Sequence, residues 1–216
     1  MRERLPEVRD RRDFIKTVSA FGFGFLVAPI GQACSEHRAT EKFFATQRPS
    51  QIEVAGSQEP GTRILLHGTI VDLEGTPIPQ VKLFLYHTDA TGYYSRPVNN
   101  PRRARLNGTL WSDARGQYSV STIKPAHYGD VDPAPPMHIH VHLQPPNLPD
   151  HWVDSFYFEG DPRLRPEDIA RGRELGRFSN VVSLAPDSAS VLKAVRDFRV
   201  DPALAERNQL SDGWYR

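Results

Sequence analysis

Short runs of β-forming residues, separated by glycine and proline turns, are the feature that most constrains the fold of this 216-residue chain. The runs ILLHGTIVD (64–72) and VKLFLYHTD (81–89) flank the turn LEGTPIPQ, and GQYSVSTIK (116–124) follows the turn SDARG. Later runs of the same kind are MHIHVHLQ (137–144), DSFYFEGD (154–161), VVSLA (181–185) and VLKAVRDFRVD (191–201). Roughly six to eight short strands punctuated in this way indicate a β-sandwich or barrel.

Only one segment favours a helix. It is RPEDIARGRELG (165–176), which carries acidic residues in its first turn. The 19 prolines and 15 glycines are scattered between the β-rich runs, which argues against a helical bundle. We therefore expect an all-β fold, a β-sandwich with long loops and one short helix, formed as a single domain.

The first 33 residues differ from the rest. RRDFIK (11–16) precedes the uncharged apolar run TVSAFGFGFLVAPI, which is too short to span a bilayer comfortably, and the small residues of GQA follow. This order predicts a signal peptide in residues 1–33, and its paired arginines resemble a twin-arginine leader. The alternative, a cytoplasmic protein with an amphipathic N-terminal helix, does not explain the separation of charged and apolar parts. We expect export to the periplasm or another extracytoplasmic location.

Cys34, the only cysteine, directly follows the expected cleavage point after Ala33, so the mature fold has no internal disulfide. Lipid attachment at Cys34 is an alternative that would anchor the protein to a membrane. Gly31 stands where such anchors usually have an apolar residue. Residues 34–60 are polar without a sustained period, and we expect an extended N-terminal arm there, followed by the folded domain in residues 61–216.

The charge balance gives no reason to propose a nucleic-acid partner. Lysine and arginine total 27 against 26 aspartate and glutamate residues, and no basic stripe interleaved with aromatic residues stands out. Beyond that, the nearly neutral charge says little about partners.

Three histidines alternate in the run at 137–144. On a strand, His138, His140 and His142 share one face, while Met137 and its alternate neighbours face the core. Histidines two positions apart stand about 6.6 Å apart along the strand and can converge on one ion, whereas a third, roughly 13 Å from the first, would miss it. The pattern therefore supplies two neighbouring ligands, and a solvated strand face carrying harmless histidines explains it equally well.

Four segments occur in order around these histidines: YHTDATGYYSR (86–96), WSDARGQYSVSTIKPAHYGD (111–130), MHIH (137–140) and SFYFEGDP (155–162). Together they resemble the intradiol ring-cleavage dioxygenases, the family of protocatechuate 3,4-dioxygenase and catechol 1,2-dioxygenase, from about Leu66 to Arg199. The resemblance implies a prealbumin-like β-sandwich in residues 61–216 that holds a non-haem ferric ion. It implies that Tyr94, Tyr128, His138 and His140 are the ligands, and that His142 is a solvated residue or supports them.

The implied reaction is ring cleavage of a catechol-type diol by O2 to a muconate-type diacid. Tyr128 would then be catalytic, because its counterpart leaves the metal and helps to take up a substrate proton. The donor set itself agrees with this chemistry, since phenolates are hard anionic ligands that favour Fe(III). Members of this family commonly associate, so the resemblance is compatible with a homo-oligomer, although the sequence does not give the oligomeric state.

The chain departs from the family pattern at three places, one of which is the short ten-residue interval from Tyr128 to His138. Pro135 stands where catalytic members usually carry an arginine, three residues before the first histidine, and Asp154-Ser155 replaces a common Thr-Gln pair. Arginines on the loop after Tyr94 are candidates to supply the missing charge. A solvated loop that keeps the protein soluble would explain them equally well. These candidates are Arg96, Arg102, Arg103 and Arg105.

Two other functions compete with ring cleavage. The first is an exported β-sandwich binding module without a metal, which explains the strands and turns but not the tyrosines and histidines. The second is a zinc or copper site that uses His138, His140 and a further histidine such as His87 or His127.

Overall fold

The computed structural model describes residues 48–97, 99–187 and 191–210. The expected signal peptide, Cys34 and the first part of the arm lie outside these residues, so the leader and the lipid anchor stay predictions. Among the helices that the structure describes, none is both long enough and apolar enough to span a bilayer.

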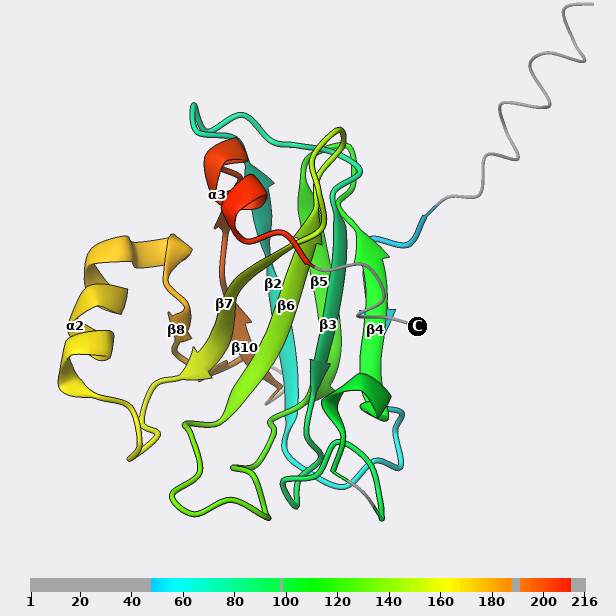
Figure 1. Cartoon of the computed structure of the whole chain (residues 1–216), viewed down its shortest axis with the longest axis vertical. Helices are drawn as coiled ribbons and strands as arrows, with labels where there is room; N and C mark the ends of the chain where they lie inside the picture. The colour runs from blue at the N-terminus through cyan, green and yellow to red at the C-terminus, as the bar shows by residue number, and fades with distance from the viewer. Residues whose placement is uncertain (1–47, 98, 188–190, 211–216) are drawn as a thin grey trace, which may run out of the picture. The chain divides into compact units, whose positions relative to one another are not determined.

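Two sheets packed face to face form the fold, as the β-rich runs predicted (Figure 1). The six-stranded sheet has the order β1–β5–β2–β10–β9, with β11 also paired to β2. Its strands are β1 (Gln51–Glu53), β5 (Gln117–Ile123), β2 (Arg63–Val71), β10 (Leu192–Val195), β9 (Ala185–Pro186) and β11 (Phe198–Arg199). The five-stranded sheet consists, in order, of β4 (Leu106–Trp111), β3 (Lys82–His87), β6 (His138–Gln144), β7 (His151–Phe158) and β8 (Val181–Val182).

The core between the sheets follows the two-residue period of the strands. The side chains that β2 and β6 turn inward are at most 1% exposed: Ile64, Leu66, Ile70, Ile139, Val141 and Leu143. Met137 packs, partly buried, against the same cluster. The predicted apolar face of β6 is therefore confirmed, and the alternate histidines point away from the core.

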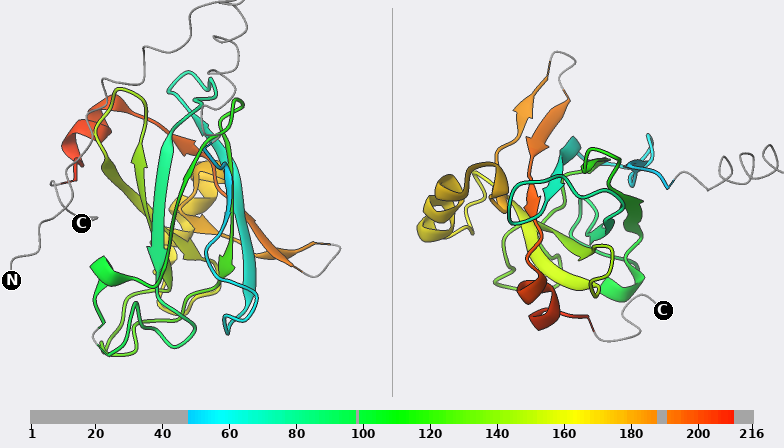
Figure 2. Two further views of the ribbon diagram at one scale, coloured as in Figure 1. Left: turned by 90° about the vertical axis from the view of Figure 1, so that its right-hand side faces the viewer. Right: turned by 90° about the horizontal axis from the view of Figure 1, so that it is seen from above.

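The predicted helix is confirmed as α2 (Pro166–Leu175), with Glu167 and Asp168 in its first turn. Two short 3₁₀ turns, η2 (Pro101–Arg103) and η3 (Gly176–Phe178), and a second helix, α3 (Pro202–Arg207), were not predicted. The Asp201 side chain caps α3 by accepting a hydrogen bond from the Ala203 N–H, 2.9 Å away. Six residues are too few to show a helical period in the sequence. The β9–β10 pair projects from the sandwich (Figure 2).

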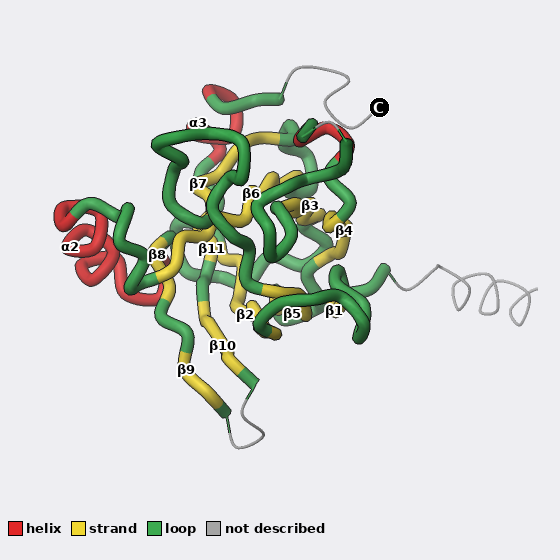
Figure 3. Tube along the Cα trace, turned by 90° about the horizontal axis from the view of Figure 1, so that it is seen from below, coloured by secondary structure: helices red, strands yellow, loops and turns green. Residues whose placement is uncertain are grey.

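Three long connections meet at one end of the sandwich, at the lower edge of Figure 1 and toward the viewer in Figure 3. They follow β3 (88–105), join β5 to β6 (124–137) and follow β7 (159–165). The Gly129 N–H donates to the Gly92 carbonyl over 3.1 Å, which joins the first two connections. Residues far apart in the chain are thus brought together beside the first residues of β6.

Candidate metal centre

The structure brings together the four side chains proposed as ligands. The hydroxyl oxygens of Tyr94 and Tyr128 are 2.6 Å apart, and the Nε2 atoms of His138 and His140 are 3.0 Å apart. The Tyr128 oxygen lies 2.8 Å from His138 Nε2 and 3.4 Å from His140 Nε2, which in turn lies 3.0 Å from the Tyr94 oxygen. Two phenol oxygens and two imidazole nitrogens therefore converge on one point.

These separations fit four donors that share one ion. Ligands bonded at about 2 Å with angles of about 90° to 110° lie roughly 2.8 to 3.3 Å from one another. The observed donor separations run from 2.6 to 3.4 Å and bracket that range. The residues present fit a metal ion.

The hydrogen atoms available cannot account for so many close contacts. The Nδ1 of His138 lies 2.7 Å from the Pro136 carbonyl oxygen, which only accepts, so the proton is on Nδ1 and the lone pair of Nε2 faces the other donors. Each hydrogen bond needs one proton, and the two phenols supply two. His140 adds a third if its proton is on Nε2, which is still too few for five contacts. A cation at the centre would attract all four lone pairs at once.

Burial keeps the donors uncharged when no cation is bound. Desolvation lowers the pKa of His140 to about 3, with a further lowering from His138, and it also lowers the pKa of His138. Desolvation raises the pKa of Tyr94, assisted by the hydrogen bond with Tyr128, and likewise raises that of Tyr128. Neutral imidazoles are ready to bind a metal, and a bonded cation is what would lower the pKa of these phenols.

Strand pairing orients His140. Tyr86 of β3 is the register partner of His140, and the two rings stack with centroids 4.5 Å apart and an interplanar angle of 19°. Tyr86 is only 2% exposed, so the stack is enclosed. Sequence reasoning gave Tyr86 no role, because the pairing of β3 with β6 was needed to place it.

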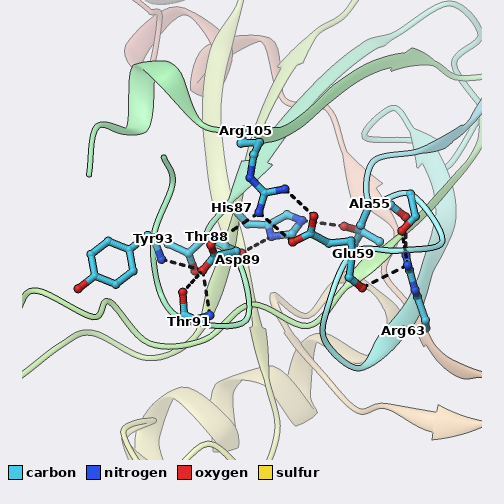
Figure 4. Close-up of polar contacts among 11 residues, drawn as sticks. Ala55, Glu59, Arg63, His87, Thr88, Asp89, Thr91, Tyr93 and Arg105 are labelled. Atoms are coloured by element: carbon cyan, nitrogen blue, oxygen red, sulfur yellow. Dashed lines mark hydrogen bonds and ion pairs between the residues drawn. The ribbon is translucent and has the colours of Figure 1, made fainter. Parts of the chain in front are cut away.

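A polar network on the connection after β3 holds the segment that leads to Tyr94; Figure 4 shows Asp89, Thr91, Tyr93 and Arg105 of this network. The Asp89 carboxylate accepts hydrogen bonds from the Thr91 and Tyr93 N–H groups, and the Arg105 N–H donates to the Tyr94 carbonyl over 2.8 Å. The Arg105 guanidinium forms two hydrogen bonds with the Glu59 carboxylate, one of them 2.8 Å long. Glu59, in the last part of the expected arm, is thus connected to the Tyr94 loop.

A buried carboxylate lies behind Tyr128. Asp161 is 3% exposed, and its oxygens lie 2.9 and 3.1 Å from Nε2 of His127, the residue before Tyr128. Although burial raises its pKa, hydrogen bonds from the Arg163 N–H and from His127 hold the pKa of Asp161 below the usual range. The carboxyl group is therefore ionised at neutral pH.

His142 is not solvated, which corrects one of its two expected environments. It is 1% exposed, because its ring packs on Trp152 with centroids 3.8 Å apart and meets Tyr86 at 5.9 Å. The strand face that carries the histidines is covered by aromatic side chains and connections instead of open to water.

The third histidine of the rival zinc or copper site is not supplied by either candidate. His87 contacts the Thr122 hydroxyl and the Thr88 carbonyl, and His127 contacts Asp161. Across the residues that the structure describes, no three His, Cys, Asp or Glu side chains cluster as a metal site would require. The side chains that lie beside His138 and His140 are Tyr128 and Tyr94 instead.

Two of the loop arginines have identified partners, and the other two are exposed. Arg105 pairs with Glu59, and Arg96 lies over the Tyr93 ring, 4.0 Å from its centroid. Arg102 and Arg103 are exposed in η2. Ser155, at one of the departures from the family pattern, lies beside a donor: its hydroxyl is 3.3 Å from His140 Nδ1.

Comparison with known proteins agrees with this geometry. The sequence model of a protein family described as Dioxygenase matches residues 40–202, most of the chain. The chain belongs to the intradiol dioxygenase family. It is 32% identical over 142 residues to the protocatechuate 3,4-dioxygenase beta chain of Burkholderia cepacia, covering 58% of this chain and 60% of that one. It is 38% identical over 76 residues to catechol 1,2-dioxygenase of Acinetobacter baylyi, covering 34% of this chain and 24% of the relative.

This intradiol family member thus matches at most about three fifths of the length of these two relatives. Among solved structures, it is similar to catechol 1,2-dioxygenase from Acinetobacter sp. ADP1, with a TM-score of 0.57 and 21% identity over 82% of this chain and 71% of that one. It is also similar to the dioxygenase domain of a carbohydrate-binding fusion protein from Streptomyces sp. SirexAA-E, with a TM-score of 0.54 and 22% identity, covering 73% and 92%. These likenesses support the fold.

Proposed function

We propose that this chain is a non-haem Fe(III)-dependent enzyme that cleaves a catechol-type diol with O2 to a muconate-type diacid. The convergence of two phenol oxygens and two imidazole nitrogens, joined by five contacts of 2.6 to 3.4 Å, carries this proposal. Membership of the family and the names of the relatives, catechol and protocatechuate dioxygenases, support a diol substrate.

The donor set favours Fe(III) over other metals. Tyr94 and Tyr128 would supply two hard anionic oxygens, and His138 and His140 two neutral nitrogens, which suits a ferric ion better than the ferrous ion. When bound, the ion would supply Lewis acidity and a template for the two substrate oxygens.

The two tyrosines differ in their exposure, and this difference supports different roles for them. Tyr94 is 4% exposed beneath its own loop, whereas Tyr128 is partly exposed. We assign Tyr128 as the group that an incoming diol can reach and Tyr94 as the ligand that stays in place. As a phenolate, the form that a bound cation would hold, Tyr128 would accept a proton from a substrate hydroxyl at its oxygen, which lies 2.8 Å from His138 Nε2.

Iron loading tests the proposal directly. Protein supplied with Fe(III) should become coloured, because tyrosinate bound to ferric ion has an intense visible band, and elemental analysis should find iron. Tyr94→Phe and His138→Ala should each lose most of the iron, since each removes one of four ligands. His142→Phe is the matched control, because it keeps a ring against Trp152 and should retain iron.

Oxygen uptake with catechol, protocatechuate and hydroxyquinol then identifies the substrate. If the protein is coloured and loaded with iron but consumes no O2 with any of these diols or with substituted catechols, ring cleavage is contradicted. Colourless protein that binds zinc or copper but no iron would favour the rival metal-binding reading.

Export is a separate proposal, based on Arg11-Arg12 and the apolar run after them. A reporter fused to residues 1–40 should leave the cytoplasm through the twin-arginine route and stay inside when both arginines are replaced by lysine. Export that is indifferent to this replacement would contradict the route.

A further inference from the structure

Asp161 connects the two segments that carry Tyr128 and His138. It follows β7, in the segment YFEGDP (157–162), which lies in one of the four segments that resemble the family. Its carboxylate lies 2.9 and 3.1 Å from His127 Nε2, and it accepts a 2.7 Å hydrogen bond from the Met137 N–H. His127 and Met137 each stand one residue before a proposed ligand.

The connection is made of short contacts in a closed environment. The Asp161 side chain is 0% exposed, so water does not compete for its oxygens. The Arg163 N–H adds a 2.9 Å bond to the same carboxylate, and the Arg163 guanidinium donates to the Ala134 carbonyl over 3.0 Å. The residues after β7 therefore hold the last part of the connection from β5 to β6 at two points, the Ala134 carbonyl and the Met137 N–H.

We propose that Asp161 is a positioning residue, which holds Tyr128 and His138 at the separation that iron binding needs. The inference rests on the proposed function, because it concerns the same four donors. Asp161 touches none of the donors itself and acts through His127 and the backbone of Met137. Groups that orient ligands in this way typically change metal affinity by about 10- to 100-fold when they are replaced.

The hydrogen-bond pattern requires a carboxylate. Both oxygens of Asp161 accept a backbone N–H, one from Arg163 and the other from Met137, and both lie near His127 Nε2. An asparagine has one acceptor oxygen and one N–H2 group. Asp161→Asn would therefore set a donor against one backbone N–H or against His127, although its shape is nearly unchanged.

The experiment compares four variants of the full chain loaded with Fe(III), the fourth being His127→Gln. Asp161→Asn breaks the connection at the carboxylate, and His127→Phe breaks only the branch to Tyr128. Asp113→Asn is the matched control, because Asp113 also accepts two backbone N–H groups, from Arg115 and Gln117, in a turn between β4 and β5. The readouts are the wavelength of the visible tyrosinate band and the rate of iron loss to a chelator.

We expect Asp161→Asn and His127→Phe to shift the band and to lose iron about 10- to 100-fold faster, with Asp113→Asn unchanged. His127→Gln should lie closer to wild type than His127→Phe in both readouts, because its amide can still donate a hydrogen bond to Asp161. If Asp161→Asn does not fold, His127→Phe and His127→Gln decide the question. An unchanged band and rate in His127→Phe would overturn the positioning role, whereas wild-type protein without a visible band would overturn the proposed function.

Discussion

The carbonyl oxygen of His127 occupies the space that a Cβ atom on Gly92 would need: the two would be 2.0 Å apart. Gly92 has a φ of +85°, which L residues with side chains adopt at a cost. The loop that carries Tyr94 and the loop that carries Tyr128 can approach one another only because position 92 has no side chain.

Gly92→Ala should therefore separate the two tyrosine loops. The left-handed conformation alone costs an alanine about 1–2 kcal/mol. We expect the free energy of unfolding to fall by more than this, and iron retention to fall strongly. Gly75→Ala is the control, because Gly75 has a φ of +87° and no atom within 4 Å of its would-be Cβ. Urea unfolding and iron analysis of both variants check this, and equal iron retention in the two would show that the close approach is dispensable.

Tyr86→Leu should weaken the iron site without removing a ligand. The variant loses the ring that stacks on His140, with centroids 4.5 Å apart, so the imidazole is free to rotate away from the shared centre. We expect iron affinity to fall about 10-fold, whereas Tyr86→Phe should stay near wild type. Competition with a chelator measures both affinities, and a similar loss in both variants would point to the hydroxyl instead of the ring.

Glu59 and Arg105 should couple weakly but measurably. Their contact joins the segment before β2 to the Tyr94 loop, yet the Arg105 side chain is 51% exposed, and solvent screens much of the attraction. A double-mutant cycle with Glu59→Gln and Arg105→Met should give a coupling of about 1 kcal/mol or less in urea unfolding at low salt. A coupling of zero would mean that the two side chains do not meet in solution.

The buried His87 should make the protein less stable in mild acid. Burial lowers the pKa of His87 to about 4, against a weaker raising effect of the Thr88 carbonyl, while the unfolded chain protonates near the ordinary value of 6.5. Because the unfolded state then binds the extra proton first, stability is present above pH 6.5 and is lost as the pH falls toward 4.

At pH 5 the low pKa of this histidine should make the free energy of unfolding about 2 kcal/mol smaller than at pH 7. His87→Gln, which keeps an amide for Thr122 and Thr88, should have a flatter profile over this interval. Urea midpoints of wild type and variant from pH 7.5 to 4.5 measure the difference. Carboxylates titrate in both proteins, so identical slopes would contradict the low pKa of His87.

Much of the fold was predictable because it depends on local patterns. The alternation in 64–72 and 137–144 reflects the pleat of a strand with one face in the core, and Ile139 and Leu143 lie where that rule put them. Short or irregular pieces lacked such a signal. β1, β4 and α3 depend on pairing partners or caps that a short window does not contain.

The sequence by itself determined most of the strands, the inward face of β6, the helix predicted at 165–176 and, by resemblance, the sandwich and the four residues that the fold brings together. The tertiary structure alone decided how they meet. Tyr86 lies on His140, Gly92 lies under His127, and Asp161 joins His127 to Met137. The physical reason is that each of these contacts joins segments that are distant in the chain, so strand register and close backbone approach create them, and no spacing in the sequence records either.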